Sequence, residues 1–434
     1  MARPPRKLRR RRPDQPRLLA HRILGAVTQQ GAYANLETGR VLAEAGLDAR
    51  DAGFVTELVS GTCRLLGTYD RILTAASGRD CFDSSLADAL RLGAHQLLSM
   101  RVGAHAAINT TVDLAAATVG EKVAGLTNAV LRKVAARDLD GWVEHLGRDE
   151  DTLGRLALRT HHPRWIAEAY VDLLGDEAEE ALAANNVPAV PTLVVRPGLA
   201  TVDELDGEPT ARSPYGARRP GNPGDLPAVR EGRAGVQDEG SQLVALNLAD
   251  AEAPAGPWLD LCAGPGGKAA LLAGLAIEQD ASLLAAELQP HRADLVAQAL
   301  RAYDGPHRPG VIAADGTRPA WPAASFAKVM ADVPCTGLGA LRRRPESRWR
   351  RSPDDLATLV PLQRRLLATA LESVRPGGVV AYVTCSPHRA ETTEVVDHVL
   401  AARDDVAVES TTQLWPHRDG TDAMFCTLLR RAPR

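Results

Sequence analysis

Two cysteines, Cys335 and Cys385, stand in short polar turns at 332–337 and 382–387. Each turn comes directly after a short apolar run that predicts a buried β-strand. A thiolate is a strong nucleophile and can bond covalently to a substrate. A single cysteine is more often a small buried hydrophobic residue, but two thiols at neighbouring strand ends would face one crevice. The pattern favours chemistry that uses both thiols.

A glycine-rich turn follows another apolar run and opens an Ala- and Leu-rich helix. Glycines at a helix N-terminus let backbone N–H groups approach a ligand, so the turn predicts a nucleotide-type site without identifying the nucleotide. Its predicted cofactor contacts are Cys262, Ala263, Gly264, Pro265, Gly266, Gly267 and Lys268.

Acidic residues end two further predicted strands. Glu287 lies 20 residues after Gly267, where a carboxylate accepts hydrogen bonds from ribose hydroxyls, although it could also be a solvated surface group. Asp315 could accept a hydrogen bond from an adenine amino group, or it could cap the next turn. Asp332 closes the strand before Cys335 and, with Glu287 and Asp315, completes the predicted cofactor contacts.

These positions require an α/β fold with a mostly parallel sheet. After residue 235, short apolar runs at 258–262, 283–288, 310–314, 327–332 and 378–384 alternate with helical segments. In such sheets, ligands bind outside the carboxyl ends of the strands. We therefore expect the two cysteine turns, the glycine-rich turn and the acidic residues to meet at one edge.

The first part of the chain has a different pattern. From 17 to 137, apolar residues recur at helical spacing, which predicts a bundle of five or six helices. We expect a basic flexible tail at 1–16, an all-α domain at 17–140, a connecting α+β subdomain with a Pro/Gly-rich loop at 141–234 and the α/β domain at 235–434. A short strand is expected at 190–195.

Composition limits the classes of function. The 434 residues carry a net charge of −3, so any attraction to nucleic acid must be local. One basic cluster lies at 1–12, and another includes the predicted RNA contacts Arg343, Arg344 and Arg348; solvated segments are the alternative for both. No apolar run is long enough to span a membrane. The six scattered cysteines favour reduced thiols in a cytoplasmic protein, without a metal.

The cysteine turns and the glycine-rich turn resemble those of RNA cytosine-5 methyltransferases, and the chain after residue 16 resembles the bacterial 16S rRNA methyltransferase B (Sun or Fmu) family. The segments 237–242 and 343–346 also look like family signatures. The helical domain resembles the NusB-type RNA-binding fold, with 128–132 at its asparagine-containing helix. Three positions depart from the usual pattern: Gly264 replaces alanine, Glu287 replaces aspartate and Thr336 replaces serine.

The resemblance implies a Rossmann-like domain that uses S-adenosylmethionine, with unpaired or flipped RNA, most notably 16S rRNA, as substrate. Carbon 5 of cytosine is a poor nucleophile, and the family assigns Cys385 to the addition at carbon 6. Asp332 would hydrogen bond or protonate N3, and Cys335 would remove the carbon 5 proton. Lys268 would lie near the cofactor and the base. We expect a monomer.

Two other functions compete with this one. The chain could be a NusB-like RNA-binding or antitermination module with a non-catalytic C-terminal domain, although both cysteines are intact. It could also be a dehydrogenase that binds a nicotinamide dinucleotide at the glycine-rich turn and Glu287, but that function leaves Cys335 and Cys385 without a role.

Overall fold

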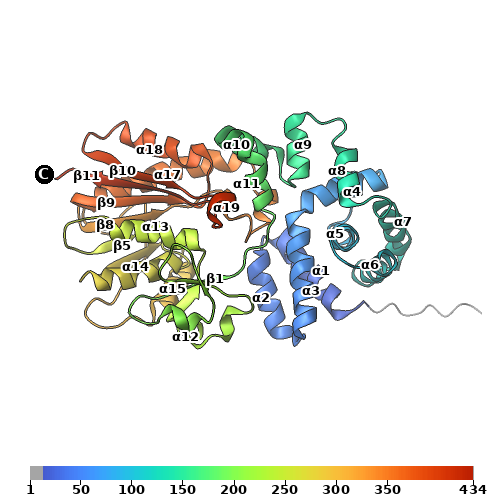
Figure 1. The fold of residues 1–434 in the computed structure, drawn as a ribbon, viewed down its shortest axis with the longest axis horizontal. Helices are drawn as coiled ribbons and strands as arrows, with labels where there is room; N and C mark the ends of the chain where they lie inside the picture. Colours follow the sequence, from blue (N-terminus) through green and yellow to red (C-terminus); the bar gives the residue numbers. More distant parts are fainter. Residues whose placement is uncertain (1–12, 434) are drawn as a thin grey trace, which may run out of the picture. The chain divides into compact units, whose positions relative to one another are not determined.

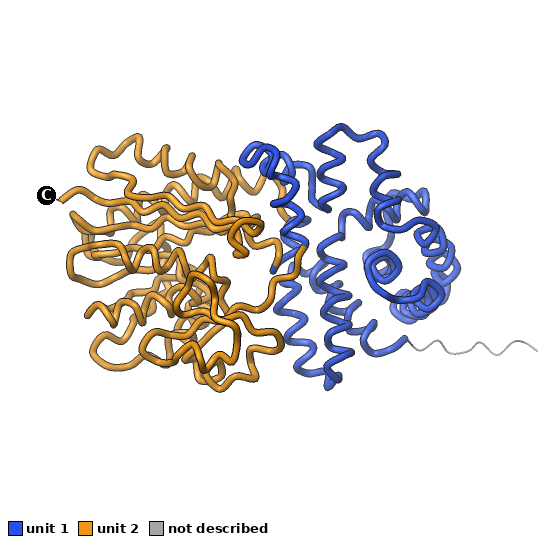
Figure 2. Tube along the Cα trace, viewed as in Figure 1, with its two compact units in different colours: residues 1–186, 343–350 blue, residues 187–342, 351–434 orange. Residues whose placement is uncertain are grey.

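The computed structural model describes residues 13–433, so most of the predicted basic tail lies outside the described residues. Contacts divide the chain into two compact units (Figure 2). Unit 1 contains residues up to 186 together with 343–350, and unit 2 contains 187–342 and 351–434. The predicted connecting region at 141–234 is thus divided, because residues up to 186 belong to the first unit and the strands that follow belong to the second.

Unit 1 is all-helical. Seven α-helices lie between residues 15 and 134 rather than five or six: α1 (Gln15–Gln30), α2 (Ala34–Ala45), α3 (Ala49–Arg64), α4 (Leu66–Ser77), α5 (Ser84–Leu98), α6 (Ala104–Thr118) and α7 (Ala124–Val134). One missed boundary is at Leu65, where α3 and α4 meet without a glycine or proline to mark the break. Four shorter helices follow: α8 (Leu139–Leu146), α9 (Thr152–Arg159), α10 (Arg164–Leu174) and α11 (Ala178–Ala184).

The segment 343–350, which includes the short helix α16 (Ser347–Arg350), packs within unit 1. Arg348 is fully buried, and its guanidinium donates to the carbonyl oxygens of His161 (3.0 Å) and Asn185 (3.2 Å) and to Oδ1 of Asn186 (2.7 Å). This burial contradicts the prediction that Arg348 contacts RNA, because its guanidinium N–H groups donate to acceptors inside the protein.

Unit 2 begins with a small antiparallel sheet in the order β2-β3-β1-β4. Its strands are β1 (Thr192–Val195), β2 (Glu208–Pro209), β3 (Gly216–Arg218) and β4 (Ala234–Val236), with the short helix α12 (Pro227–Arg230) before β4. The predicted strand at 190–195 is confirmed as β1. The other three strands were not predicted, because runs of two or three residues carry no periodic signal.

The main sheet of unit 2 has seven strands in the order β10-β11-β9-β8-β5-β6-β7. Five are the predicted ones: β5 (Trp258–Asp260), β6 (Leu283–Glu287), β7 (Gly310–Ala313), β8 (Phe326–Asp332) and β9 (Val374–Thr384). They are parallel to one another. The strands β10 (Val406–Gln413) and β11 (Phe425–Arg431) add an antiparallel edge that was not predicted.

Helices cover both faces of this sheet (Figure 1). On β9, Val379, Ala381 and Val383 pack with α13 (Glu239–Asp250), α14 (Gly267–Glu278) and α15 (Pro290–Leu300). The alternate residues Val380 and Tyr382 pack with α17 (Asp354–Ser373) and α18 (Thr393–Leu400) on the other face. This alternation is the two-residue period of a strand buried on both sides. The short helix α19 (Pro416–Asp419) precedes β11.

The parallel strands bring their carboxyl ends to one edge of the sheet. The strand β5 lies between β6 and β8, so the chain order reverses there, and such a reversal leaves a crevice for a ligand. The turns after β5, β6, β8 and β9 carry the residues that the sequence singles out. Within residues 13–433, no helix has the length and apolar character that a bilayer crossing requires.

Candidate active site

The glycine-rich turn joins β5 to the N-terminus of α14. Gly266 adopts a positive φ of 107°, and a Cβ added there would lie 2.7 Å from the Cβ of Ala299. Only glycine fits this position without displacing α15. The turn therefore brings its backbone close to its neighbours and aims the first N–H groups of α14 toward the edge of the sheet, as a cofactor-binding turn requires. Cys262, Ala263 and Gly264 precede this bend, and Pro265 is the exposed residue beside it.

Glu287 ends β6 and is only 5% exposed. Its Oε2 accepts the backbone N–H of Gly264 at 3.0 Å, and its Oε1 accepts that of Gln289 at 3.0 Å. Arg292 donates to the Gly264 carbonyl oxygen at 2.7 Å and lies 3.7 Å from Glu287 Oε1. Glu287 is therefore not a solvated surface carboxylate. It is held against the glycine-rich turn, where its remaining lone pairs suit hydroxyl donors.

Gln237 gives an independent indication of a ligand beside this turn. Its side chain is 6% exposed, and neither its Nε2 nor its Oε1 has a hydrogen-bond partner among residues 13–433. A Cβ added at Gly267 would lie 3.8 Å from Oε1 of Gln237. A buried amide without partners is costly, so a polar ligand here would satisfy it. Gln237 and Glu287 thus offer hydrogen-bonding groups to a polar ligand at this turn.

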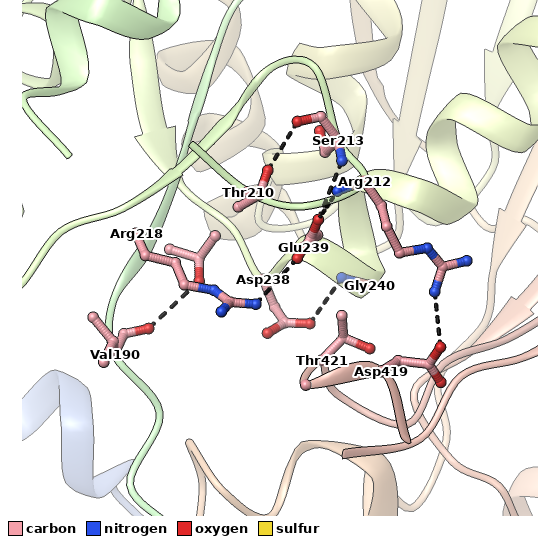
Figure 3. A network of polar contacts seen from close by, with 12 residues as sticks. Val190, Thr210, Arg212, Ser213, Arg218, Asp238, Glu239, Gly240, Asp419 and Thr421 are labelled. Carbon is pink, nitrogen blue, oxygen red and sulfur yellow. Dashed lines mark hydrogen bonds and ion pairs between the residues drawn. The ribbon is translucent and has the colours of Figure 1, made fainter. Parts of the chain in front are cut away.

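A polar network fixes the segment that follows Gln237 (Figure 3). Asp238 accepts the N–H groups of Gly240 (3.0 Å) and Asp422 (2.8 Å). Glu239, which is 2% exposed, accepts those of Arg212 (2.7 Å) and Ser213 (3.1 Å). These bonds anchor the start of α13 and explain why acidic residues follow Gln237.

Asp315 follows β7, and its Oδ1 accepts both the backbone N–H (2.9 Å) and the hydroxyl (2.8 Å) of Thr317. These hydrogen bonds lower the pKa of its carboxyl group. Asp315 thus caps the next turn, which is one of the two roles expected from the sequence. Its Oδ2 takes no part in that cap. The adenine contact stays a prediction.

The two cysteines after β8 and β9 come together. Sγ of Cys335 lies 3.4 Å from Sγ of Cys385, and both residues are partly buried. The backbone N–H of Gly339 donates to the Cys385 carbonyl oxygen at 2.8 Å, which ties the two turns to each other. The hydrogen bond with Cys385, together with burial, raises the pKa of Cys335 well above its usual range. Either thiol can be the donor of this hydrogen bond.

Lys268 and Asp332 lie beside the thiols. Lys268 Nζ donates to Asp332 Oδ2 at 2.8 Å, and the side chains are 13% and 26% exposed. Burial alone would lower the pKa of Lys268, but the charge and hydrogen bond of Asp332 outweigh burial, and the pKa is raised. Cys385 contributes to this rise, so the ammonium group in turn favours a Cys385 thiolate.

Several residues of this site were not predicted. Asp260, which ends β5, is 1% exposed, and burial followed by the charge of Asp332 raises its pKa to about 7. Arg292 contacts the predicted residue Gly264, and Glu391 contacts Thr336, the residue after Cys335. An acidic residue before the glycine-rich turn was visible in the sequence, but its burial was not. Arg292 and Glu391 stand in helical segments, where a charged residue carries no local signal.

The remaining predicted RNA contacts lie in unit 1. Arg344 is partly exposed, and its guanidinium stacks on the ring of Tyr33 at 4.8 Å from the centroid. Arg343 is also partly exposed. The positions of these two arginines neither support nor contradict an RNA contact, which stays a prediction. In the part of the chain that the structure describes, no group of three or more His, Cys, Asp or Glu side chains could hold a metal ion.

Two family models match the sequence. One is described as 16S rRNA methyltransferase RsmB/F and matches residues 243–430, and the other is the NusB family and matches residues 14–136. The first covers nearly all of the main sheet and its helices. The second covers the seven helices α1 to α7.

Individual relatives extend over the whole chain. A Mycobacterium tuberculosis (strain CDC 1551) protein with the provisional name methyltransferase MT1451 is 47% identical over 97% of this chain and 98% of its own length. Ribosomal RNA small subunit methyltransferase B of Pseudomonas putida KT2440 is 32% identical over 89% of each chain. The crystal structure of PH0851 matches with a TM-score of 0.81 at 22% identity, over 95% of this chain and 97% of that one. This last likeness concerns the fold alone.

Proposed function

Because the chain belongs to the 16S rRNA methyltransferase RsmB/F family, we propose that it methylates carbon 5 of a cytosine in 16S rRNA through a covalent cysteine intermediate. Membership of this family makes the protein an S-adenosylmethionine-dependent RNA methyltransferase, and the nicotinamide alternative is thereby set aside. The observation that carries the covalent mechanism is the pair of thiols, 3.4 Å apart, beside the Lys268–Asp332 ion pair.

The first step is addition of Cys385 to carbon 6 of the base. The sulfur forms a bond to carbon 6, and the electron pair of the C5–C6 double bond moves so that carbon 5 becomes nucleophilic. Lys268 favours the thiolate that this step needs, and with Cys385 as a thiolate the hydrogen of the Sγ–Sγ contact comes from Cys335.

Negative charge develops on the ring during this addition. Asp332 is held by Lys268 at 2.8 Å, so we assign stabilisation of the charge at N3 to the ion pair rather than to an isolated carboxyl group. A positioned lysine and carboxylate supply both a proton donor and an acceptor to the polar edge of a cytosine.

When bound at the glycine-rich turn, S-adenosylmethionine would supply the methyl group that carbon 5 accepts. Cys335 then accepts the carbon 5 proton, the C6–S bond breaks, and its electrons return to Cys385. Once Cys385 is bonded to carbon it is a neutral thioether, which removes the largest cause of the raised pKa of Cys335. Cys335, which is partly exposed, can then release its own proton to water and accept the carbon 5 proton as the base.

The substrate and setting follow from the family. The NusB-like region is proposed to bind RNA, and an unpaired or flipped cytosine is the expected target. A protein that modifies ribosomal RNA would work in the cytoplasm, and we propose that it does so as a monomer.

The test separates the two cysteines. Cys385→Ala should abolish both methylation and any covalent adduct, whereas Cys335→Ala should form an adduct that persists, because the carbon 5 proton is not removed. A denaturing gel with labelled 16S rRNA and S-adenosylmethionine would show a slowly migrating band for Cys335→Ala alone. Cys426→Ala, a buried cysteine of the same unit outside the proposed mechanism, is the control. A persistent adduct in Cys385→Ala instead would exchange the two roles, and no adduct in either variant would contradict the mechanism.

A further inference from the structure

A buried carboxylate lies directly behind the two cysteine turns. Glu391 ends a short 3-10 helix, Arg389–Glu391, and is 0% exposed. Its Oε1 accepts the backbone N–H of Thr336 at 2.8 Å and the Nε2 of Gln363 at 3.0 Å. Its Oε2 accepts the Thr336 hydroxyl. These donors are neutral, so they solvate the carboxylate without cancelling its charge.

The same carboxylate connects both turns. Gln363 Nε2 also donates to the carbonyl oxygen of Pro334 at 2.9 Å, so residues on either side of Cys335 are held. Thr336 Oγ1 lies 3.1 Å from Oγ of Ser386, the residue after Cys385. The hydroxyl of Tyr382, on β9, donates to the Glu391 carbonyl oxygen at 2.7 Å. These hydrogen bonds, made by buried groups on the protein-interior side of the two turns, thus fix the spacing of the two thiols.

We propose that Glu391 is a positioning residue, which holds the Cys335 and Cys385 turns in register and whose negative charge keeps the proton on Cys335 until the release step. This inference rests on the proposed two-cysteine mechanism. Glu391 does not touch the reacting atoms and acts through Thr336 and the Cys335 turn.

The charge has a reason beyond hydrogen bonding. A glutamine could accept the same backbone N–H without the cost of burying a charge, which is several kcal/mol for an unpaired ion. The titratable groups that act on Cys335 are Cys385, Glu391 and Asp332, with Tyr382 packed nearby. Glu391 and Asp332 both raise the pKa of Cys335. After Cys385 has bonded to the base, these two charges remain and preserve the basicity of Cys335.

The charge is tested without RNA or cofactor. In the full-length Cys385→Ser protein, only the Cys335 thiol of the pair remains, and its rate of alkylation by iodoacetamide is followed against pH by site-resolved mass spectrometry. Glu391→Gln should lower the pH of half-maximal rate by about one to two units, because a buried negative charge is removed. Glu394→Gln is the matched control, since Glu394 is exposed three residues further along.

The positioning role is tested with Cys385 intact. In single-turnover reactions with labelled 16S rRNA and S-adenosylmethionine, the covalent adduct should persist at least about tenfold longer in Glu391→Gln than in wild type or Glu394→Gln, because the NH2 group of a glutamine cannot accept the Thr336 hydroxyl. Binding of S-adenosylhomocysteine should be unchanged within about twofold, since Glu391 does not contact the glycine-rich turn. Aspartate keeps the charge of glutamate but is shorter. In the Cys385→Ser protein, Glu391→Asp should therefore leave the alkylation profile unchanged, whereas with Cys385 intact it should prolong the adduct.

If Glu391→Gln leaves the alkylation profile of the Cys385→Ser protein unchanged, the electrostatic part of the inference is overturned. If Glu391→Gln leaves the adduct lifetime unchanged, the positioning part is overturned. If Glu391→Gln does not fold, Glu391→Asp decides: a prolonged adduct supports positioning and a wild-type lifetime refutes it. If even wild type forms no adduct, the proposed function fails, and the alkylation experiment still judges the charge of Glu391.

Discussion

Gly264→Ala should weaken cofactor binding, although alanine is the residue that the family resemblance leads one to expect at this position. A Cβ added to Gly264 would lie 2.1 Å from Oε2 of Glu287 and 3.0 Å from Nε of Arg292. Glu287 is itself one methylene longer than the aspartate that is common there. The longer acid fills the space that an alanine methyl would occupy, so the two departures from the family pattern compensate for each other.

The size of the effect follows from what the displaced carboxylate holds. Glu287 cannot move without loosening its hydrogen bonds to the N–H groups of Gly264 and Gln289, both 3.0 Å long. A hydrogen bond to a charged group contributes about 1.5–3 kcal/mol, and overpacking alone costs about 1–3 kcal/mol. We expect a loss of about 2 kcal/mol in cofactor binding, which is about a thirtyfold rise in Kd.

A double-mutant cycle tests this reasoning. Isothermal titration calorimetry with S-adenosylhomocysteine would compare wild type, Gly264→Ala, Glu287→Asp and the double variant. Residues in contact couple by about 0.5–3 kcal/mol. The Kd of the double variant should therefore be at least about fivefold lower than the Kd expected if the two single effects simply multiplied. Additive effects would refute the compensation, and wild-type affinity in Gly264→Ala would refute the steric argument itself.

Two further predictions concern charge. The pKa of Asp260 is raised from 3.8 to about 7, so its ionisation opposes folding, and stability is lost as the pH rises through this range. In urea unfolding, the stability of Asp260→Asn relative to wild type should therefore increase by about 2.5 kcal/mol from pH 5 to pH 8, and a constant difference would contradict the buried, protonated state. The double variant Arg343→Ala/Arg344→Ala should bind 16S rRNA more weakly, and its affinity should depend less on salt, by up to about two released counterions. The affinity for S-adenosylhomocysteine should be unchanged. A salt dependence equal to that of wild type would mean that both arginines are solvated surface groups.

The candidate site was predictable where its signals are local. Each strand that ends in a functional residue is a short apolar run followed by a polar or glycine-rich turn, so β5, β6, β8 and β9 were found with their turns. Parallel pairing then brings these ends to one edge without further information. The 3.4 Å approach of Cys335 and Cys385 follows from β8 and β9 being neighbours in the sheet.

The residues that support the site were not predictable in this way. Glu391 contacts Thr336, which is 55 residues away in the chain, and Arg292 contacts the carbonyl oxygen of Gly264, which is 28 residues away. A charged residue in a helical segment reads as a solvated surface group until its partner is known. The antiparallel strand β10 was missed for a related reason, since most of its side chains are exposed and it has no apolar run.

The arginine cluster shows where an argument from charge alone fails. Arg343, Arg344 and Arg348 form one basic run in the sequence, yet Arg348 is fully buried while the other two are partly exposed. Its partners are the carbonyl oxygens of His161 and Asn185 and the side chain of Asn186, all more than 150 residues earlier in the chain. These hydrogen-bond acceptors are uncharged, and burial lowers the pKa of Arg348 to about 9. A basic run can thus contain both a residue that is buried within the helical unit and residues that are partly exposed, and only the fold distinguishes them.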